Sequence, residues 1–422
     1  MSDLIHKELN HLFRHEYGKL VALLTKVFGA TNLAFVEDVA QDTLLKALES
    51  WKLKGIPQNP SAWLYTVARN RALDLLRKKK HEEAFVRHLN PLLTSEYTAS
   101  LTLEEAFKNS VLEDEQLRMM FICCHPSISE DAQAALILKT LCGFSVAEIA
   151  SAFLTNQETI TKRLFRAREK LREATISFDV PPATELSERL ESVLTAVYLL
   201  FNEGYHATHN SLLIREDLVE EALRLGYLLT KNNRTKTTNT LALLALMCFH
   251  AARLYSRIDS IGTFIPLKEQ DRSQWNQELI QKGISFLQQA SQGETLSAYH
   301  LEAAIAYEHC IAPGYDNTNW ESIDQLYAKL MQVRPAPLIT FQHAIIKAER
   351  FGPEAGLQHM ISLENDPALS THHFFFTAKG MWLAQLNRNT EARVQFQKAL
   401  HLAQVPSEKK FIQSKIDTLP SL

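Results

Sequence analysis

The hydrophobic positions of the chain recur mostly at the spacing of amphipathic helices. Between residues 3 and 28, apolar side chains return every three or four positions, and the pattern stops at Gly29. This is typical of a helix that buries one face and ends at a glycine. A second helix is predicted over about 33–51, before the loop KLKGIPQN at 52–59. The positions predicted to face its core are Val36, Val39, Ala40, Leu44, Ala47, Leu48 and Trp51.

The opposite face of this second helix is acidic. It carries Asp38, Gln41, Asp42, Leu45 and Glu49. A row of acids with an exposed leucine suits the binding of a partner helix, although a plain solvated face gives the same pattern.

A third helix begins at Pro60, where a helix tolerates proline in its first turn. Its predicted buried positions are Trp63, Leu64, Val67, Ala68 and Leu75. Residues 69–80 hold six Lys/Arg and one acid, Asp74, a net charge of +5. Aromatic side chains beside a basic helix suit single-stranded nucleic acid, because bases stack on them and phosphates need counter-charge. The alternative for Trp63 is a place in the core.

Residues 81–113 break the helical periodicity and are expected to form a linker or a loosely structured connection. Acids reappear there, at Glu82, Glu83, Glu104 and Glu105. Such a segment either lies over the basic modules when nucleic acid is absent or is simply solvated. Two more helices are predicted over 114–141, with Pro126 between them and Ser129 as a cap.

The stretch SVAEIASAFLTNQETITKRLFRAREKLR at 145–172 predicts two helices joined by a tight turn at Thr155 and Asn156. Ser145 and Glu148 have the spacing of a capping box, at the start of a short first helix. The second helix is expected over about 157–172, with six Lys/Arg and two Glu, a net charge of +4. Its predicted buried face consists of Ile160, Leu164, Ala167 and Leu171.

A helix-turn-helix unit places its second helix in the DNA major groove, where residues near the helix start face base edges. Gln157, Glu158 and Thr159 occupy that start and can hydrogen-bond to bases. The basic residues further along would meet phosphates. Taken alone, the motif also fits a solvated basic helix on a helical protein. The basic helix upstream favours nucleic-acid binding.

Composition narrows the class of protein. The 422 residues are 46% hydrophobic and 22% charged, with few Gly and Pro, which favours an all-α globular protein of two to four domains. The net charge of −3 does not by itself indicate nucleic acid, so the clustering of basic residues carries that argument. No secretory signal or transmembrane run is recognised, so a cytoplasmic protein without membrane contact is expected. Five Cys without metal-ligand spacing predict buried free thiols, and no metal, cofactor or catalytic residue is expected.

Two of these segments resemble a known family. Residues 33–80, with VEDVAQDTLLKALESW and PSAWLYTVARNRALDLLRK, are similar to region 2 of an extracytoplasmic-function (ECF) sigma factor of the sigma-70 family. Residues 114–173, with GFSVAEIASAFLTNQETITKRLFRAREKL, are similar to its region 4. The resemblance implies that region 2 binds the clamp coiled coil of the RNA polymerase β′ subunit and opens the −10 promoter element. Region 4 would read the −35 element and contact the β flap.

The resemblance also assigns residues to each surface. The residues expected to face the polymerase clamp are Asp38, Gln41, Asp42 and Leu45. Those expected near the −10 element are Lys54, Asn59, Trp63, Arg69, Asn70 and Asp74. Those expected to face −35 DNA are Gln157, Glu158, Thr159, Lys162, Arg163 and Arg166. The loop KGIPQN at 54–59 departs from the family's commoner version, which contains aspartate and arginine.

The chain continues for some 240 residues beyond Pro181-Pro182. Near its end, MWLAQLNRNTEARVQFQKAL resembles a tetratricopeptide repeat, with Asn387 where the repeat usually has glycine. The residues in its packing positions are Trp382, Leu383, Leu386, Ala392, Phe396, Ala399 and Leu400. A similar segment at 355–359 lies 37 residues before 392–396, near the repeat period of about 34. An ordinary helical hairpin is the alternative.

The whole tail resembles that of a sigma subgroup in which a helical, repeat-bearing extension replaces a separate anti-sigma factor. YLLFNEGY at 198–205 and EQDRSQW at 269–275 match that tail. Their polar residues are expected to cap helices and pair charges rather than to form an acid/base or metal site: Asn202, Glu203, Glu269, Asp271 and Arg272. Concave repeat surfaces bind peptides or small ligands, so an unknown ligand or protein is the expected partner of the tail.

The domains expected are region 2 at 1–84, a linker at 85–113, region 4 at 114–178 and a regulatory helical-repeat domain at 183–422. The function expected is that of a bacterial transcription initiation factor, not an enzyme, that binds core RNA polymerase and promoter DNA and is regulated in cis. The alternative is a helical scaffold or signal-sensing protein with a helix-turn-helix module. The pairing of two basic helices with an acidic clamp-like stripe favours the first.

Overall fold

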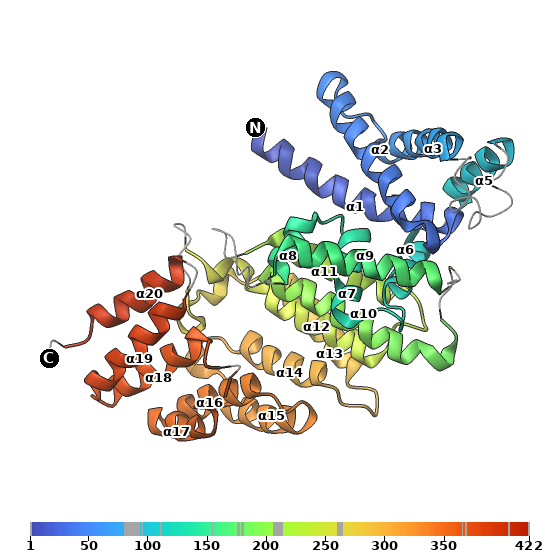
Figure 1. Ribbon diagram of the computed structural model, residues 1–422. Coiled ribbons are helices and arrows are strands. Elements are labelled where there is room, and N and C mark those ends of the chain that lie inside the picture. The colour runs from blue at the N-terminus through green and yellow to red at the C-terminus, as the bar shows by residue number, and fades with distance from the viewer. Residues whose placement is uncertain are drawn as a thin grey trace. The chain divides into compact units, whose positions relative to one another are not determined.

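A computed structural model describes residues 2–79, 93, 96–109, 112–153, 155–174, 178, 181–205, 214–259, 265–364, 366–367, 369–403 and 406–420. Over these ranges the regular elements are α-helices and short 3₁₀ turns, which confirms the all-α prediction (Figure 1). The chain divides into two compact units, Met1–Leu200 and Phe201–Leu422. The division falls inside helix α10 (Ala183–Tyr205). None of the described helices is both long and apolar enough to span a membrane.

Unit 1 begins with three packed helices, α1 (Ser2–Phe28), α2 (Leu33–Lys54) and α3 (Pro60–Lys79). The 3₁₀ turn η1 (Ala30–Asn32) joins the first two. Helix α1 packs against α2, and α2 packs against α3. Gly29 and Gly55 end α1 and α2 with φ of 82° and 80°, a backbone conformation that favours glycine. The three predicted helices are therefore confirmed, with the ends at Phe28 and Pro60, whereas α2 extends to Lys54, three residues into the segment predicted to be a loop.

Five of the predicted core positions in α2 and α3 are not fully buried. Leu48 in α2 is 47% exposed and Leu44 is half-buried, because the buried stripe of α2 follows Val36, Val39, Ala40, Thr43, Ala47 and Trp51. Leu48 lies about 100° around the helix from Ala47, beyond the edge of that stripe. In α3 Leu76 is buried, while the predicted positions Trp63, Val67 and Leu75 are half-buried.

The segment predicted to be loosely structured contains helix α5 (Glu96–Asn109). This helix packs on α3 and α1, and Ala99 and Leu103 are fully buried. The expectation of loose structure over 81–113 was therefore wrong for residues 96–109. The helix was not predicted because most of its residues are polar and only a narrow face is apolar. The proposed region boundary at residue 84 lies outside the described residues.

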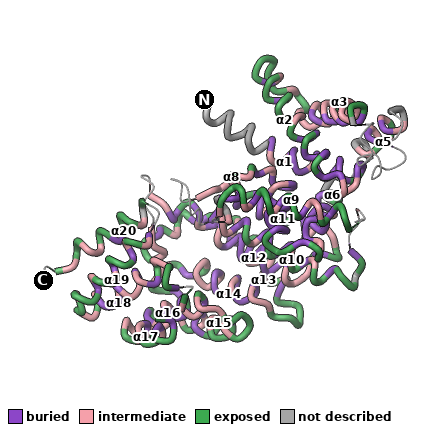
Figure 2. The backbone as a smooth tube through the Cα atoms, viewed as in Figure 1, coloured by how far each residue is buried: buried purple, intermediate pink, exposed green. Residues whose placement is uncertain are grey.

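Four further helices complete most of unit 1: α6 (Leu112–Cys123), α7 (Glu130–Thr140), α8 (Val146–Ala152) and α9 (Gln157–Glu173). Helix α7 is buried along almost its whole length and packs against α6, α8 and α9. Ser129 stands at its N-cap position, as predicted, although its side chain makes no capping hydrogen bond. Figure 2 shows the buried positions of these helices beside the exposed ones of α9.

Unit 2 is a chain of helices in which sequence neighbours pack together. After α10 come α11 (Glu216–Leu229), α12 (Thr238–Ala252), α13 (Gln277–Ala290), α14 (Ala298–Ile311), α15 (Trp320–Val333), α16 (Pro337–Phe351), α17 (Pro353–His359), α18 (His373–Gln385), α19 (Asn389–Leu402) and α20 (Pro406–Asp417). The 3₁₀ turns between them are η3 (Leu254–Arg257), η4 (Leu267–Glu269), η5 (Arg272–Gln274), η6 (Tyr315–Asn317) and η7 (Ile361–Leu363). The apolar run in α12 is buried nearly throughout, which explains its uniform hydrophobicity.

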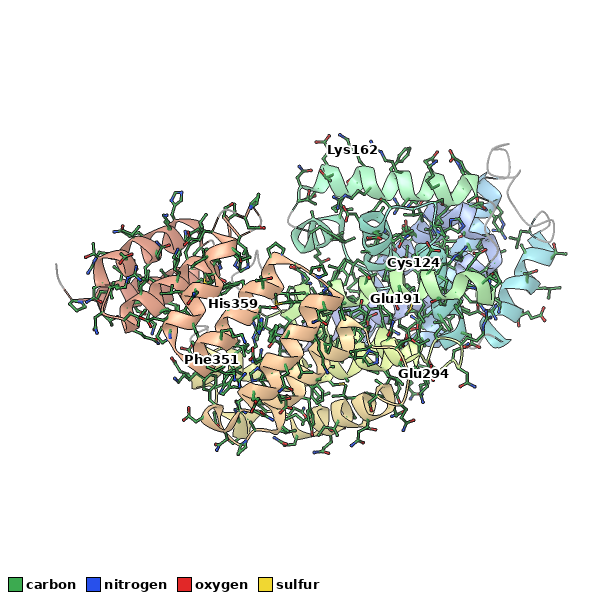
Figure 3. The ribbon with its side chains drawn as sticks, turned by 90° about the horizontal axis from the view of Figure 1, so that it is seen from below. Cys124, Lys162, Glu191, Glu294, Phe351 and His359 are labelled. Atoms are coloured by element: carbon green, nitrogen blue, oxygen red, sulfur yellow. The ribbon has the colours of Figure 1, made fainter. Side chains whose placement is uncertain are left out.

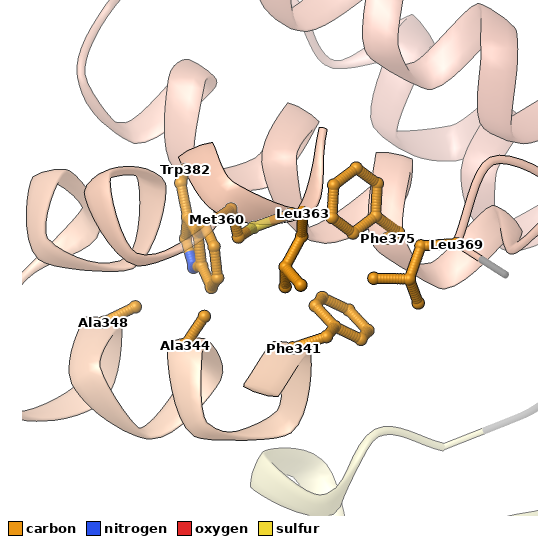
Figure 4. Packing of buried hydrophobic residues seen from close by; sticks show 8 residues of the cluster. All are labelled: Phe341, Ala344, Ala348, Met360, Leu363, Leu369, Phe375 and Trp382. Atoms are coloured by element: carbon orange, nitrogen blue, oxygen red, sulfur yellow. The ribbon is translucent and has the colours of Figure 1, made fainter. Parts of the chain in front are cut away.

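The last helices of unit 2 form paired hairpins, α16 with α17 and α18 with α19. Trp382 reaches from α18 into a cluster with Phe341 and Ala344 of α16 (Figure 4). The residues in predicted packing positions that are buried are Trp382, Leu383, Ala392, Phe396 and Ala399, while Leu386 and Leu400 are half-buried. Asn387 has a positive φ of 61°, which is the conformation for which a glycine is usual in a turn of this kind.

Candidate nucleic-acid interface

A side-chain cap marks the start of each helix in the helix-turn-helix unit. The backbone N–H of Ser145 donates to Glu148 Oε2 at 2.8 Å, and the N–H of Glu148 donates to Ser145 Oγ at 3.2 Å. This reciprocal pair is the predicted capping box. Asn156 then caps α9, because its Oδ1 accepts the N–H of Thr159 at 2.8 Å. The sequence interpretation placed Asn156 in the break and missed this role.

Helix α9 separates an apolar face from a charged one, as predicted. Its buried residues are Ile160, Leu164, Ala167 and Leu171. On the other side Gln157, Glu158, Lys162 and Arg166 are exposed, and Thr159 and Arg163 are half-buried. Figure 3 shows Lys162 pointing away from the body of the protein. The six residues assigned to −35 DNA therefore lie along one accessible side of a single helix.

Two of these side chains already have acidic neighbours. Lys162 Nζ lies 2.6 Å from Glu158 Oε1, one turn earlier on the same exposed surface. Arg163 Nη2 lies 3.1 Å from Asp131 Oδ2 of α7 and is mostly covered. A pair between exposed side chains is weak and exchanges readily for a phosphate. Arg166 is the more accessible of the two arginines.

The charged face of α9 also carries an aromatic side chain that sequence reasoning missed. Phe165 is 62% exposed, between Lys162 and Arg166. The signal was present, because residue 165 falls outside the repeat of apolar positions that face the core. A large apolar side chain on such a helix can contact the methyl group of thymine in the major groove.

Three of the six residues assigned to the −10 element, Lys54, Trp63 and Asn70, line an open pocket between α2 and α3. This pocket, of about 410 Å³, is lined by Lys46, Glu49, Ser50, Leu53, Lys54, Trp63, Val67 and Asn70. Trp63 is half-buried and packs on the ring of Trp51, with centroids 5.4 Å apart. One part of the Trp63 side chain thus packs in the core, and another part is exposed at the pocket wall. The pocket wall combines an aromatic ring with exposed cationic and amide groups.

Three other −10 candidates make contacts of their own. Asn59 Oδ1 accepts the N–H of Ala62 at 3.0 Å, so Asn59 caps the start of α3. Arg69 Nη1 lies 3.8 Å from Glu104 of α5. One acid of the segment expected to be a linker thus lies beside the basic helix α3. This agrees with the interpretation that the acidic segment lies over a basic module. Asp74 pairs with Arg77 at 3.2 Å on the surface of α3.

The acidic stripe of α2 is accessible. Asp38 and Gln41 are exposed, and Leu45 is 57% exposed. Asp42 is half-buried, since Arg71 of α3 donates from Nε to its Oδ2 at 2.7 Å. Exposed Leu48 extends the apolar part of the stripe by one turn. Three of the four expected polymerase residues are thus available to a partner, and the fourth also ties α2 to α3.

Two polar residues of the EQDRSQW phrase have partners that hold the local fold together. Asp271 caps η5 by accepting the N–H of Ser273 at 2.9 Å. Arg272 donates to the carbonyl oxygens of His309 and Ala312, each at 2.6 Å, and lies over the ring of Trp275. Within the described ranges no group of three or more His, Cys, Asp or Glu side chains could hold a metal ion.

The cysteines match the prediction of buried free thiols. Cys123, Cys124, Cys142 and Cys248 are buried and Cys310 is half-buried, all unpaired to one another. Burial raises the pKa of Cys123, Cys248 and Cys310 to about 12. Thiols of this kind are packing groups and not nucleophiles.

Comparison with known families gives a match for each of the two segments that carry the basic helices. Residues 12–82 match the family Sigma-70 region 2, and residues 118–171 match the family Sigma-70, region 4. Residues 189–291, which include both tail phrases, match a family of unknown function, DUF6596. Sigma factors are non-enzymatic transcription initiation factors that bind core RNA polymerase and promoter DNA.

Two relatives have comparable sequences. An uncharacterized protein of Rhizobium meliloti is 33% identical over 388 residues, which cover 92% of this chain and 90% of that protein. The ECF RNA polymerase sigma-E factor of Haemophilus influenzae is 27% identical over 169 residues, which cover 39% of this chain and 86% of that factor. The chain therefore contains sigma-70 regions 2 and 4 of the ECF type, followed by a helical C-terminal extension that includes the DUF6596 segment.

Proposed function

We propose that this sigma factor directs RNA polymerase to promoters by reading −35 DNA with α9 and −10 DNA with the surface around the α2–α3 pocket. The observation that supports this most directly is the accessible face of α9. It presents Gln157, Glu158 and Thr159 at a capped helix start, followed by basic residues. Groups at the helix start reach base edges, and basic groups beyond them reach phosphates.

The α2–α3 pocket suits an unstacked base of the −10 strand. Trp63 offers a ring face for stacking, and Lys54 offers a cation for the backbone. Asn70 supplies an amide that can donate to a base edge and accept from it. Arg69 would exchange its contact with Glu104 for a phosphate when the strand arrives.

We assign the clamp of the β′ subunit to the α2 stripe and the β flap to the region 4 helices. The variant that tests the clamp contact is Asp38→Arg. Asp38 is exposed, whereas Asp42→Arg would also place two arginines together, because Asp42 binds Arg71. Asp38→Arg should abolish co-purification with core RNA polymerase, since a like charge meets a basic partner surface. The control is Glu188→Arg, a similar charge reversal at an exposed position of α10. The protein that carries it should co-purify with core RNA polymerase as the wild-type chain does.

Promoter reading is tested by run-off transcription from genomic fragments with core polymerase and the purified chain. Once a promoter is found, Gln157→Ala should relax preference at one −35 base pair by roughly 1–3 kcal/mol. A base-pair substitution series that gives the same profile for both proteins would exclude Gln157 as a base reader.

We further propose that residues 183–422 form a tetratricopeptide-like regulatory domain, active in the cytoplasm, that controls promoter use in cis and binds a ligand or protein. The hairpins α16–α17 and α18–α19, with Asn387 in its glycine-like turn, support the repeat assignment. We assign the tail a required, positive role, because the Pro181-Pro182 junction is shorter than the flexible hinge that a built-in inhibitor would need.

The matching test is a chain that ends after Leu200, the end of unit 1. This cut preserves the part of α10 that belongs to unit 1, which a cut at residue 178 would remove. Circular dichroism should show that the shortened chain remains helical. Transcription should then fall relative to the full chain, and equal transcription by both proteins would rule out regulation at this step.

A further inference from the structure

The ends of the two tail phrases, YLLFNEGY and EQDRSQW, meet at the end of helix α12 in unit 2. Arg253 occupies the C-cap position of α12, and its guanidinium lies 5.8 Å from the centre of the Tyr205 ring, at the end of the first phrase. Directly after the second phrase, the backbone N–H of Asn276 donates to the carbonyl oxygen of Ala252 at 2.8 Å. Neither phrase has a part in promoter reading, so a separate role is open to the place where they converge.

Two arginines at this place have no acidic partner. The guanidinium of Arg272 lies 5.0 Å from the centre of the Trp275 ring. It donates to two backbone carbonyl oxygens at the end of α14 and to the hydroxyl of Thr318, all of which are neutral acceptors. Arg253 is half-buried, and the contact that the structure gives its side chain is the one with Tyr205. Over the described ranges, neither arginine forms an ion pair with a carboxylate.

A third arginine contacts the same tyrosine. The guanidinium of Arg257 lies 3.7 Å from the centre of the Tyr205 ring and donates to the Tyr205 carbonyl oxygen. Arg257 is only 6% exposed. Burial lowers the pKa of Arg257, and the charge of Arg253 lowers it further. Tyr205 therefore carries two guanidinium groups that are close enough to repel each other.

The neighbouring side chains also record a positive potential. Burial first, and then the charges of Arg253 and Arg272, lower the pKa of His309 in α14 to about 3. Burial and the charge of Arg253 lower the pKa of Arg272 as well. The imidazole of His309 is therefore neutral at pH 7 and has one N–H to donate. A bound anion would relieve the repulsion between the arginines.

Two polar atoms beside these arginines are buried without a hydrogen bond. Trp275 is 3% exposed, and its indole Nε1 has no hydrogen-bond partner among the described residues. The same holds for Nδ1 of His309. A buried donor left without a partner costs about 1–3 kcal/mol, and the oxygen of an anion is an acceptor for such donors.

We propose that this arginine cluster, formed by Arg253, Arg257 and Arg272 with Trp275 and His309 beside it, binds a small oxyanion of the phosphate or carboxylate type. The planar fork of a guanidinium group matches both kinds of oxyanion. The proposal names a ligand for the tail, which the function proposed above leaves open, and as a regulatory signal it rests on that function. The binding itself is a property of unit 2.

Isothermal titration calorimetry of the full-length chain tests the site. Inorganic phosphate and citrate are titrated separately, and sodium chloride of equal ionic strength is the reference. At least one of the two anions should bind saturably at one site, with a Kd in the millimolar range or tighter. Binding of phosphate alone identifies the phosphate type, and binding of citrate alone identifies the carboxylate type. Absence of saturable binding by both would overturn the proposal.

Arg253→Gln is the decisive variant, because Arg253 holds no other described part of the chain by a hydrogen bond or ion pair. It should weaken anion binding at least tenfold, whereas Arg253→Lys, which keeps the charge, should bind more tightly than Arg253→Gln. The matched control is Lys231→Gln, which removes an exposed cation 4.9 Å from the centre of the Tyr227 ring and should bind as the wild-type chain does. Circular dichroism establishes that each variant is folded. Wild-type affinity in folded Arg253→Gln would exclude the site.

Hydrogen exchange locates the binding. At a ligand concentration of about ten times Kd, the slowest amides of α12, η5 and α14 should exchange roughly tenfold more slowly than without the anion. The same measurement on Arg253→Gln at that concentration should show little change. Equal slowing in α9 of unit 1 would indicate a general salt effect and would contradict a site in the arginine cluster.

The anion site and the proposed function fail in different ways. If the wild-type chain supports run-off transcription but binds neither anion, the anion site is wrong and the function stands. If it binds an anion through Arg253 but neither binds core polymerase nor supports transcription, the proposed function is wrong and the site stands.

Discussion

A buried aspartate in unit 2 offers a quantitative test of how the tail is held together. Asp324 of α15 accepts a hydrogen bond from His343 Nε2 at 2.6 Å and from Lys347 Nζ at 3.0 Å, and it also binds Arg350. All three partners lie on α16. Asp324→Asn would remove the negative charge that Lys347 and Arg350 bind, with almost no change in volume.

The size of the effect follows from the pKa of Asp324. Burial raises this pKa, but the hydrogen bonds from Lys347, His343 and Arg350 outweigh burial and lower it from 3.8 to about 2. A shift of this size corresponds to about 2 kcal/mol once solvent screening at the partly exposed Lys347 and Arg350 is included. Because the pKa is lowered, this stabilisation is complete above pH 3.8 and is lost as the pH falls towards 2.

Hydrogen exchange of α15 and α16 is the suitable assay, because a chain of two units need not unfold in a single step. Asp324→Asn should speed exchange of the slowest amides in these helices about 30-fold at neutral pH. Glu321→Gln is the matched control, since Glu321 is 70% exposed, lies 3.6 Å from Arg350 and should change exchange by no more than about twofold. Equal exchange in the two variants would refute this account of Asp324.

Three further predictions concern α9 and the cysteines. Arg166→Ala should reduce the salt dependence of promoter DNA binding by about one phosphate contact, measured as the slope of log K against log salt; Arg163→Ala should have a smaller effect because Asp131 already holds this side chain. Asn156→Ala should destabilise region 4 by about 1 kcal/mol through loss of the α9 cap, measured by hydrogen exchange, and an unchanged rate would exclude a capping role. The five cysteine thiols should react slowly with Ellman's reagent at pH 8 until the chain is unfolded, and rapid reaction of any thiol in the native chain would contradict its burial.

Periodicity was sufficient to predict the helices of both sigma regions, because each buries a regular stripe of apolar side chains. It placed the exposed rows of α2 and α9 correctly. It failed at Leu48, which was predicted to face the core but lies outside the buried stripe. The exposed Phe165 was overlooked, although its position outside the stripe can be read from the sequence. The periodicity of apolar positions also does not predict contacts between residues that are far apart in the sequence.

The missed features are those that depend on such contacts. Asn59 was assigned to the −10 surface and Asn156 to the break between two helices, and their capping roles, which depend on where the next helix begins, were not predicted. The pairs Asp42–Arg71 and Glu37–Arg168 join residues 29 and 131 positions apart. Helix α5 was missed because its packing on α3 and α1, and not its own apolar pattern, accounts for its place in the fold.

The state of the thiols limits the kinds of signal that this factor can sense. Oxidants such as peroxide attack the thiolate form, and burial keeps Cys123, Cys248 and Cys310 protonated at any physiological pH. Adjacent Cys123 and Cys124 are both fully enclosed, which leaves no accessible pair for a regulatory disulfide at that position. Direct oxidation of these thiols would therefore require local opening of the helices that enclose them.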